Sequence, residues 1–460
     1  MEQRVRDMTT GRPVRLILSF ALPLMLGSIF QQLYTVVDTA VVGRYVGVEA
    51  LAALGATDWL NWLVLSLIQG LTQGFSILIS QRFGANDIQG LWKSITMSIW
   101  LCAGSTVVLS AVSQIALRPA LRLIRTPDNI FEGAATYLHI CYGGIAVIMA
   151  YNMFASILRA LGDGKTPLYA MVIASVINIV LDFLFVVGFH WGIAGAAIAT
   201  VIAQFCSAVF CLRAVQNITV LQMDAESWKL DGACLRHLLR LGAPLALQNV
   251  IISVGGLGVQ YIVNSFGYLF IAGFTATNKL YGLLELAAIS FGFSAATYVG
   301  QNLGARQYAR IRHGVHAACL MAICTSIVVS AVMLLFGRSI IGLFVSKTAP
   351  QYDAVLQTAY TYLTVMCVPL SILYLLHVYR ASLQGLGDTL MPMVSGFAEL
   401  IFRLLCAATL PLALGETGIF YAEPAAWAGA TAILLISYYI RIRKLSRVDE
   451  PRPLHHVSAG

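Results

Sequence analysis

Residues 166–188 read TPLYAMVIASVINIVLDFLFVVG, a run in which Asp182 is the one charged side chain. A helix needs about 20 mostly apolar residues to cross the hydrocarbon core of a bilayer, so this run predicts a membrane span. Similar runs recur along the chain from Val14 to Tyr439. Charged residues make up 11% of the 460 residues, against roughly 25% in a typical soluble protein. The chain has too little charge to cover a water-facing surface, and we predict a polytopic, all-α membrane protein.

The remaining composition argues against several other classes of protein. The net charge of +8 comes from Lys and Arg residues scattered singly between apolar runs, whereas a nucleic-acid-binding protein clusters them on one face. The nine cysteines form no CxxC pair and mostly lie inside apolar runs, so we expect neither disulfides nor a zinc site. The apolar run after Arg15 is too long for the hydrophobic region of a signal peptide, and we expect the first span to be retained.

The hydropathy of the chain predicts twelve spans, six in each half. A polar connection at 214–237 separates an N-lobe at 1–213 from a C-lobe at 238–440, which a tail at 441–460 follows. The predicted spans are 14–42, 50–80, 92–117, 132–158, 166–188, 191–213, 238–265, 274–300, 314–337, 355–380, 391–413 and 418–440.

Lys and Arg residues predict the orientation of these spans. With the N-terminus inside, the two tails and the even-numbered loops hold 21 of the 29 Lys and Arg residues, and the opposite loops hold about seven. One residue, Arg403, falls inside a span. Basic residues concentrate on the cytoplasmic side of membrane proteins. We therefore predict a multi-pass protein of the inner (plasma) membrane with both termini in the cytoplasm.

The two halves of the chain repeat each other. Residues 81–85 (QRFGA) match 301–305 (QNLGA) at an offset of 220, and 161–163 (LGD) match 386–388 (LGD) at an offset of 225. Each half has six spans, so both halves cross the membrane in the same direction. Parallel repeats of this kind are typical of secondary transporters, in which the transport path lies between the repeats.

One enzyme motif needs an explanation. Residues 385–388 match the GxGD string of intramembrane aspartyl proteases, with Asp388 as the candidate catalytic residue. The equivalent Asp163 lies in the matching loop of the first half, and Pro follows both elements. A duplicated Gly-Asp element followed by Pro is better explained as a helix stop and turn. We expect no enzyme activity.

Acidic residues inside spans are informative because an ionised carboxylate at the bilayer centre costs about 2.5–3.5 kcal/mol. Asp38 and Asp182 lie about 8 and 9 Å from the outer ends of their spans, and Thr200 lies about 14 Å deep, at 1.5 Å per residue. Asn178 is one turn before Asp182 on the same helix face. Two carboxylates at one depth can share a proton or bind a cation together, and the alternative is ordinary polar contact between helices.

The chain resembles the multidrug and toxic compound extrusion (MATE) transporters, and within them the DinF-like branch. The resemblance covers about residues 10–440. It rests on the duplicated twelve-span layout, on Gln31-x-x-Tyr34-x-x-x-Asp38, on Asn178-x-x-x-Asp182 and on residues 300–305.

This resemblance implies a fold and a site. The fold would be two pseudo-symmetric six-helix bundles that form a V, with a cavity between them. Residues equivalent to Asp38, Asn178, Asp182 and Thr200 form the cation site of similar transporters, for H⁺ or Na⁺. Tyr34 would lie beside that site, and Pro23 would be the point at which the first helix bends.

The chain departs from the NorM-like branch, which carries acidic residues in spans seven and ten. Instead, span eleven offers Glu399 and Arg403, an i,i+4 pair whose role is either structural or in gating and substrate binding. Gln31 and Asn152 are candidates to line the cavity, although Asn152 is as well explained by a hydrogen bond between helices. His377 in span ten is explained either as a titratable group or as a core histidine.

These observations predict a secondary active exporter that works by alternating access. It would export organic compounds, cationic or amphipathic, in exchange for H⁺ or Na⁺, with no other cofactor. We expect small molecules and lipids as partners, no nucleic acid, and a monomer. The first alternative is a flippase for lipid-linked precursors, which would be expected to line its cavity with several Arg or Lys residues. A channel and a protease are weaker alternatives.

Overall fold

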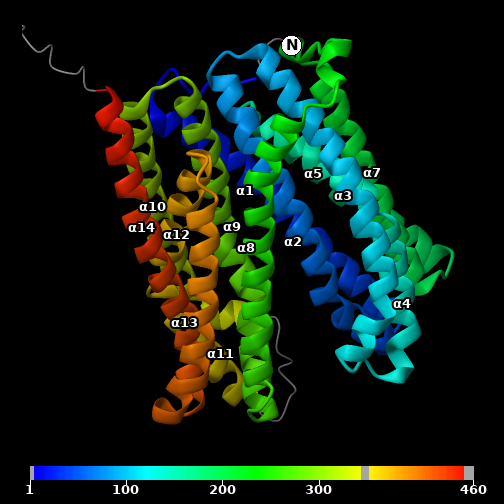
Figure 1. The fold of residues 1–460 in the computed structure, drawn as a ribbon. Coiled ribbons are helices and arrows are strands. Elements are labelled where there is room, and N and C mark those ends of the chain that lie inside the picture. The colour runs from blue at the N-terminus through cyan, green and yellow to red at the C-terminus, as the bar shows by residue number, and fades with distance from the viewer. Residues whose placement is uncertain (1–4, 343–351, 450–460) are drawn as a thin grey trace, which may run out of the picture.

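The computed structural model describes residues 5–342 and 352–449. Arg4, Lys347 and the end of the tail, which entered the predicted topology, lie outside the described residues. Within that range the chain is helical and forms no strand. Figure 1 shows two groups of long helices, one from each half of the chain, which lie close together at the end that carries the N-terminus and diverge toward the other end. We call these the closed end and the open end.

The helices of the first half fall into six spans. They are α1 (Pro13–Tyr45), α2 (Val48–Gly84), α3 (Ile88–Leu123), α4 (Asp128–Gly143) with α5 (Ile145–Ala160), α6 (Lys165–Asp182) with the π-helix η1 (Phe183–Gly188), and α7 (Gly192–Gln216).

The second half repeats this order after two short 3₁₀ turns, η2 (Thr219–Leu221) and η3 (Ala225–Trp228). Its helices are α8 (Gly232–Val263), α9 (Tyr268–Gly304), α10 (Tyr308–Ile341), α11 (Tyr352–Cys367) with α12 (Leu370–Gly385), α13 (Leu390–Leu414), and η4 (Glu416–Tyr421) leading into α14 (Ala422–Asp449).

The described residues contain ten helices that are long and apolar enough to cross a membrane, and two bent pairs bring the number of spans to twelve. The predicted twelve spans are therefore confirmed. The fourth and tenth spans differ from the prediction because each is broken by a 49° bend, at Gly144 and before Pro369. Gly weakens a helix through its backbone freedom, and Pro lacks the N–H that would donate to a carbonyl oxygen of the preceding turn.

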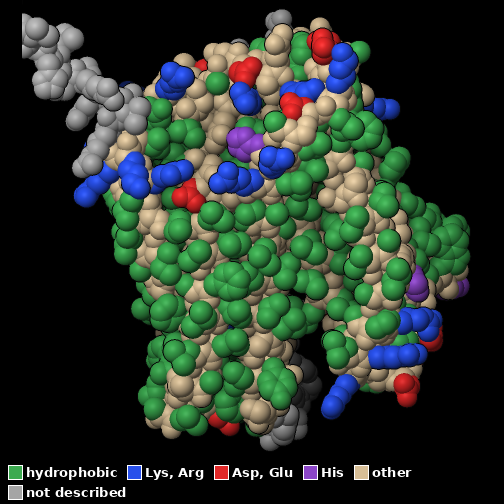
Figure 2. All heavy atoms as spheres, viewed as in Figure 1, with side chains coloured by type: hydrophobic (Ala, Val, Ile, Leu, Met, Phe, Trp, Pro, Cys, Tyr) green, Lys and Arg blue, Asp and Glu red, His purple; other side chains and the backbone are tan. Residues whose placement is uncertain are grey.

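The surface agrees with a membrane protein. In Figure 2 apolar side chains cover the middle of the molecule, and most Lys and Arg side chains in this view gather near the closed end. The same view shows the two bundles separated at the open end. A broad apolar belt between charged ends is the pattern that a bilayer requires.

The duplicated motifs join the two halves at the closed end. Gln81 Nε2 on α2 donates to the carbonyl oxygen of Gly385, 2.9 Å away, and the equivalent Gln301 Nε2 on α9 donates to that of Ala160, also 2.9 Å away. A Cβ atom on Gly304 would lie 1.9 Å from the Gln81 carbonyl oxygen, so the backbones of α2 and α9 touch. The repeat therefore produces two equivalent, reciprocal contacts across a pseudo-two-fold axis.

The segment before α1 reinforces this contact. Met8 is fully buried, and its backbone N–H donates to Gln301 Oε1, 2.8 Å away. Its carbonyl oxygen accepts from Asn302 Nδ2 at 3.1 Å and from Arg310 Nη2 at 3.3 Å. The N–H of Arg6 donates to the carbonyl oxygen of Leu161 in the first half. Residues 6–8 thus hydrogen-bond to both halves.

The first helix of each half crosses into the other half near the closed end. Ile17 and Phe20 of α1 belong to the hydrophobic core that α9–α14 form, whereas Val42 of the same helix belongs to the core of the first half. Correspondingly, Leu238 and Leu241 of α8 belong to the core of the first half. The predicted division into 1–213 and 238–440 gives the order of the spans. In space, however, the start of the first helix of each half packs in the hydrophobic core of the other half.

Candidate cation site and the charged cluster of the C-lobe

The predicted carboxylate pair comes together inside the first bundle. Asp38 lies on α1 and Asp182 is the last residue of α6, and they are 7% and 0% exposed. Their carboxyl groups lie within hydrogen-bonding reach of each other. Both carboxyl oxygens of Asp182 and Oδ1 of Asp38 are buried and have no hydrogen-bond donor among the described residues. Two adjacent buried carboxylates without donors need a proton or a cation, because burying an uncompensated charge is costly.

The supporting oxygens lie where the sequence places them. Asn178 is one turn before Asp182 on α6 and is 1% exposed, and its Nδ2 donates to Thr200 Oγ1 on α7 at 3.3 Å. The Asn178 Oδ1 atom has no partner among the described residues. The π-helix η1 begins directly after Asp182, and single π-turns inside helices often mark functional sites. Asn178 and Thr200 therefore form one hydrogen-bonded pair, one helical turn from Asp182, in which Asn178 is buried and Thr200 is partly exposed.

The donor set suits a small monovalent cation. Carboxylate, amide and hydroxyl oxygens are ligands that hard cations prefer. The described residues contain no group of three or more His, Cys, Asp or Glu side chains that could hold a metal ion, as a transition-metal site would require. Asp38, Asp182, Asn178 and Thr200 would hold Na⁺, and the two carboxylates alone would hold a proton.

A small cavity lies one turn away from the carboxylates. Gln31 and Tyr34 of α1 line it together with Tyr151 of α5 and Gln204 of α7. Tyr151 Oη and Gln204 Oε1 are buried and have no partner among the described residues. Sequence reasoning missed these two residues, although Gln204 is one turn from Thr200 on the same helix face, which was a usable signal.

Two other predicted residues have more local roles. Asn152 donates from Nδ2 to the carbonyl oxygen of Ile148 in its own helix, at 2.9 Å, rather than to another helix. Pro23 lies inside α1, which runs through it without a break. The close approach of α1 to α6 follows one turn later at Gly27, where a Cβ atom would lie 2.7 Å from Met171 Sδ.

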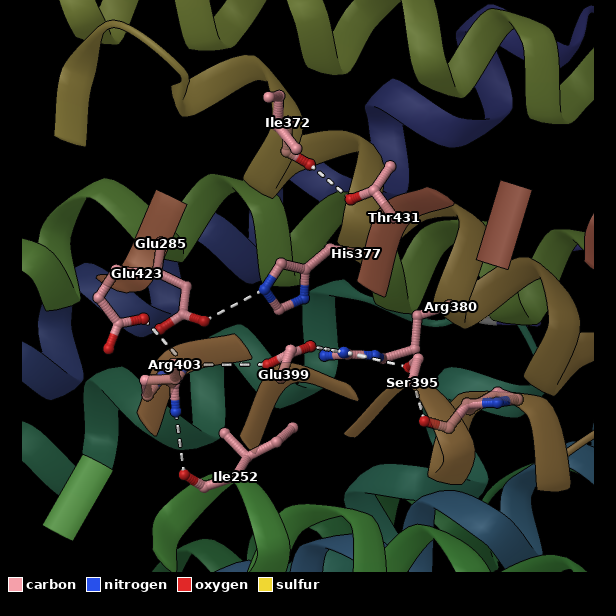
Figure 3. Close-up of polar contacts among 11 residues, drawn as sticks. Ile252, Glu285, Ile372, His377, Arg380, Ser395, Glu399, Arg403, Glu423 and Thr431 are labelled. Atoms are coloured by element: carbon pink, nitrogen blue, oxygen red, sulfur yellow. Dashed lines mark hydrogen bonds and ion pairs between the residues drawn. The ribbon is translucent and has the colours of Figure 1, made fainter. Parts of the chain in front are cut away.

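The Glu399–Arg403 pair is part of a larger charged cluster in the second bundle, shown in Figure 3. The two side chains are 3.8 Å apart, but each has a closer partner. Glu399 bonds to Arg380 Nη2 from α12, and Arg403 Nη2 is 2.9 Å from Glu423 Oε2 on α14. The prediction that Arg403 is the one basic residue deep in a span is wrong, because Arg380 is also buried, at 8% exposed.

His377 belongs to the edge of this cluster. Its Nε2 atom lies 3.1 Å from Glu285 Oε1 on α9, and both side chains are partly exposed. This contact agrees with both explanations of His377, a titratable group and a hydrogen-bonded core histidine. The ion pairs of the cluster join two carboxylates, Glu399 and Glu423, to two guanidinium groups, and Figure 3 shows the His377–Glu285 pair beside them.

The Gly-Asp elements are helix stops, as predicted. Gly162 and Gly387 have φ of +82° and +79°, a conformation that favours glycine. Asp163 Oδ1 accepts from the backbone N–H groups of Lys165 and Thr166, and Asp388 Oδ1 accepts from that of Met391. Both carboxylates thus bond to the start of the helix that follows.

Comparison with known proteins agrees with this geometry. The sequence profile of the family described as MatE matches residues 23–184 and 244–409, one match in each half of the chain. The first match begins at Pro23 and the second at Pro244. The chain belongs to the MatE family. Members of this family are membrane transporters, and the predicted fold class and family are confirmed.

Relatives and a solved structure support the same assignment. "Probable multidrug resistance protein YpnP" of Bacillus subtilis is 31% identical over 342 residues, which cover 74% of this chain and 76% of that protein. "DNA damage-inducible protein F" of Escherichia coli is 27% identical over 341 residues, 72% of each chain. A solved structure described as the "outward-facing conformation of a multidrug resistance MATE family transporter" superposes with a TM-score of 0.89 at 22% identity, covering 97% of this chain and 99% of that one.

Proposed function

We propose that this MatE-family protein exports organic compounds, cationic or amphipathic, in exchange for H⁺ or Na⁺. A relative is described as a probable multidrug resistance protein, and this description supports export of organic compounds. The observation that carries the exchange mechanism is the pair Asp38 and Asp182, whose buried oxygens lack donors among the described residues. A bound cation would compensate their charge, and its release would favour a different arrangement of the helices around them.

Counterflow in proteoliposomes tests this function. The purified protein is reconstituted, loaded with an unlabelled candidate compound and given a trace of the labelled compound outside, with a pH gradient and a Na⁺ gradient imposed separately. We expect the preloaded compound to drive accumulation of the label, and one of the two ion gradients to increase that accumulation until the gradient is dissipated. Equal accumulation in protein-free vesicles would refute export, and a voltage-dependent conductance without counterflow would indicate a channel.

The flippase alternative finds less support. A pyrophosphate headgroup would bind several free guanidinium or ammonium groups. The two most deeply buried arginines of the second bundle, Arg380 and Arg403, are instead held by Glu399 and Glu423. We propose small organic molecules as substrates, lipids as surroundings, no nucleic acid, no organic cofactor and a monomeric transporter.

The orientation is part of this proposal. The excess of basic residues near the closed end favours a cytoplasmic location for both termini and for the connection 217–231, which leaves the open end facing outward.

We expect a cysteine placed at the exposed position 224 to resist a membrane-impermeant maleimide in intact cells, because that side faces the cytoplasm. A cysteine at Arg122, which is exposed in the last turn of α3 at the open end, serves as the positive control. Both variants are compared in a background that lacks the exposed Cys324. Rapid labelling at 224 together with protection at 122 would reverse the proposed orientation.

A further inference from the structure

A small polar pocket lies between the two bundles, directly below the closed end. Gln73, Ser76 and Ser80 line it from α2, Arg159 from α5, Phe293 from α9 and Gln384 from α12. Its volume of about 20 Å³ is enough for a water molecule. The pocket is separate from the carboxylate site, which lies within the first bundle.

Equivalent positions of the two halves line this pocket. Arg159 and Gln384 are related by the offset of 225 residues, and Gln73 and Phe293 by the offset of 220. The pocket therefore lies on the pseudo-two-fold axis that relates the halves. Its lining is asymmetric in charge, because the arginine of the first half corresponds to a neutral amide in the second.

Arg159 has no carboxylate partner among residues 5–342 and 352–449. Its Nη2 atom donates to Ser156 Oγ at 2.8 Å, and its guanidinium carbon lies 4.9 Å from the centroid of the Phe293 ring. A guanidinium group has five N–H donors in a planar fork that matches a carboxylate or a phosphate. Arg380 and Arg403 are neutralised by glutamates, whereas Arg159 keeps its charge and most of its donors available.

The pocket is also well placed for a molecule that enters from the closed end. Arg159 directly precedes Ala160, whose carbonyl oxygen accepts the bond from Gln301. Gln384 likewise directly precedes Gly385, whose carbonyl oxygen accepts the reciprocal bond from Gln81. A movement that parted the bundles at this end would break these bonds and expose Arg159. A carboxylate or phosphate group of an organic molecule is larger than water, so it could enter this pocket only after the bundles part.

We propose that Arg159 binds an oxyanion, a carboxylate or a phosphate group, of the molecules that this protein exports. This inference rests on the proposed export function and narrows its substrates to amphipathic molecules that carry such a group. The charge-assisted bonds to Arg159 would position the substrate on the axis between the two bundles before the closed end forms again.

Binding of a matched dye pair to the purified protein tests this proposal without any gradient. Rhodamine B carries a free carboxylate, and its ethyl ester does not. We expect Arg159→Gln, which places an amide on both sides of the axis, to weaken binding of rhodamine B by about tenfold, because a hydrogen bond to a charged group is lost. Binding of the ester should change by less than about twofold, and Arg159→Lys should retain part of the preference for the acid.

Arg122→Gln is the matched control, since it removes the same charge from an exposed position far from the pocket. Equal changes for acid and ester, or no change for either, would overturn the proposal and leave Arg159 a structural contact of Phe293. Competition by phosphatidylglycerol, but not by phosphatidylcholine, that depends on Arg159 would identify a lipid as the source of the oxyanion. Failure of counterflow for every compound would refute the export function while leaving this binding result standing.

Discussion

Asp38→Asn should leave a protein that still inserts into the membrane but no longer exports its substrate in response to a gradient, and Asp182→Asn should do the same. Each change replaces one of two adjacent buried carboxylates by an amide of the same shape, which imitates the protonated form and cannot release a proton. The remaining carboxylate also loses its partner for sharing a cation. The export rate should fall to that of protein-free vesicles.

The measurement is gradient-driven uptake of a labelled compound into inverted proteoliposomes, normalised to the amount of reconstituted protein. Asp128→Asn is the matched control, because Asp128 is exposed at the start of α4, and this variant should export at the wild-type rate. Substrate binding in the absence of a gradient should survive in both site variants. Export at the wild-type rate by either site variant would reduce the four residues to ordinary polar contacts between helices.

Glu399→Gln should destabilise the second bundle strongly. The change leaves Arg380 without a carboxylate partner among the described residues, while Arg403 keeps Glu423 at 2.9 Å. Removing one partner of a buried ion pair costs about 3–5 kcal/mol, because the remaining charge stays buried without compensation. Arg380→Gln should restore much of that stability in the double variant, and Arg403→Gln should not.

Thermal unfolding of the detergent-solubilised protein and its level in the membrane measure this effect. Glu132→Gln is the matched control, since Glu132 forms an exposed ion pair with Arg118 at 2.9 Å, and such pairs contribute about 1 kcal/mol or less. An equal rescue by Arg380→Gln and Arg403→Gln would mean that both guanidinium groups depend on Glu399. Normal stability of Glu399→Gln would show that the cluster does not hold the bundle together.

Sequence periodicity found the parts of the site that lie on one helix. Asn178 and Asp182 are one turn apart on α6, and Glu399 and Arg403 are one turn apart on α13, so a period of 3.6 places each pair on one face. The depth of Asp38 in the membrane stays a prediction, which rests on its position along the span at 1.5 Å per residue.

Contacts between helices could not be found in this way. The predicted span 355–380 ends at Arg380, whereas α12 continues to Gly385, and Arg380 lies inside the bundle beside Glu399. Arg159 likewise follows the predicted span 132–158, and it lies in a pocket because the two bundles meet there. Such positions depend on how segments that are distant in the sequence pack together, and no local sequence pattern predicts that packing.

The exchange of helix ends between the bundles determines when each core can be completed during synthesis. Leu16, Ile17 and Phe20 of α1 pack against residues of α9 and of later helices, which leave the ribosome more than 250 residues afterwards. At about 5–20 residues per second, that delay is roughly a quarter of a minute to a minute. Throughout it, the start of α1 has lipid or insertion machinery as its neighbour. The first half also waits for α8, so neither half of this transporter can finish folding before the other has been inserted.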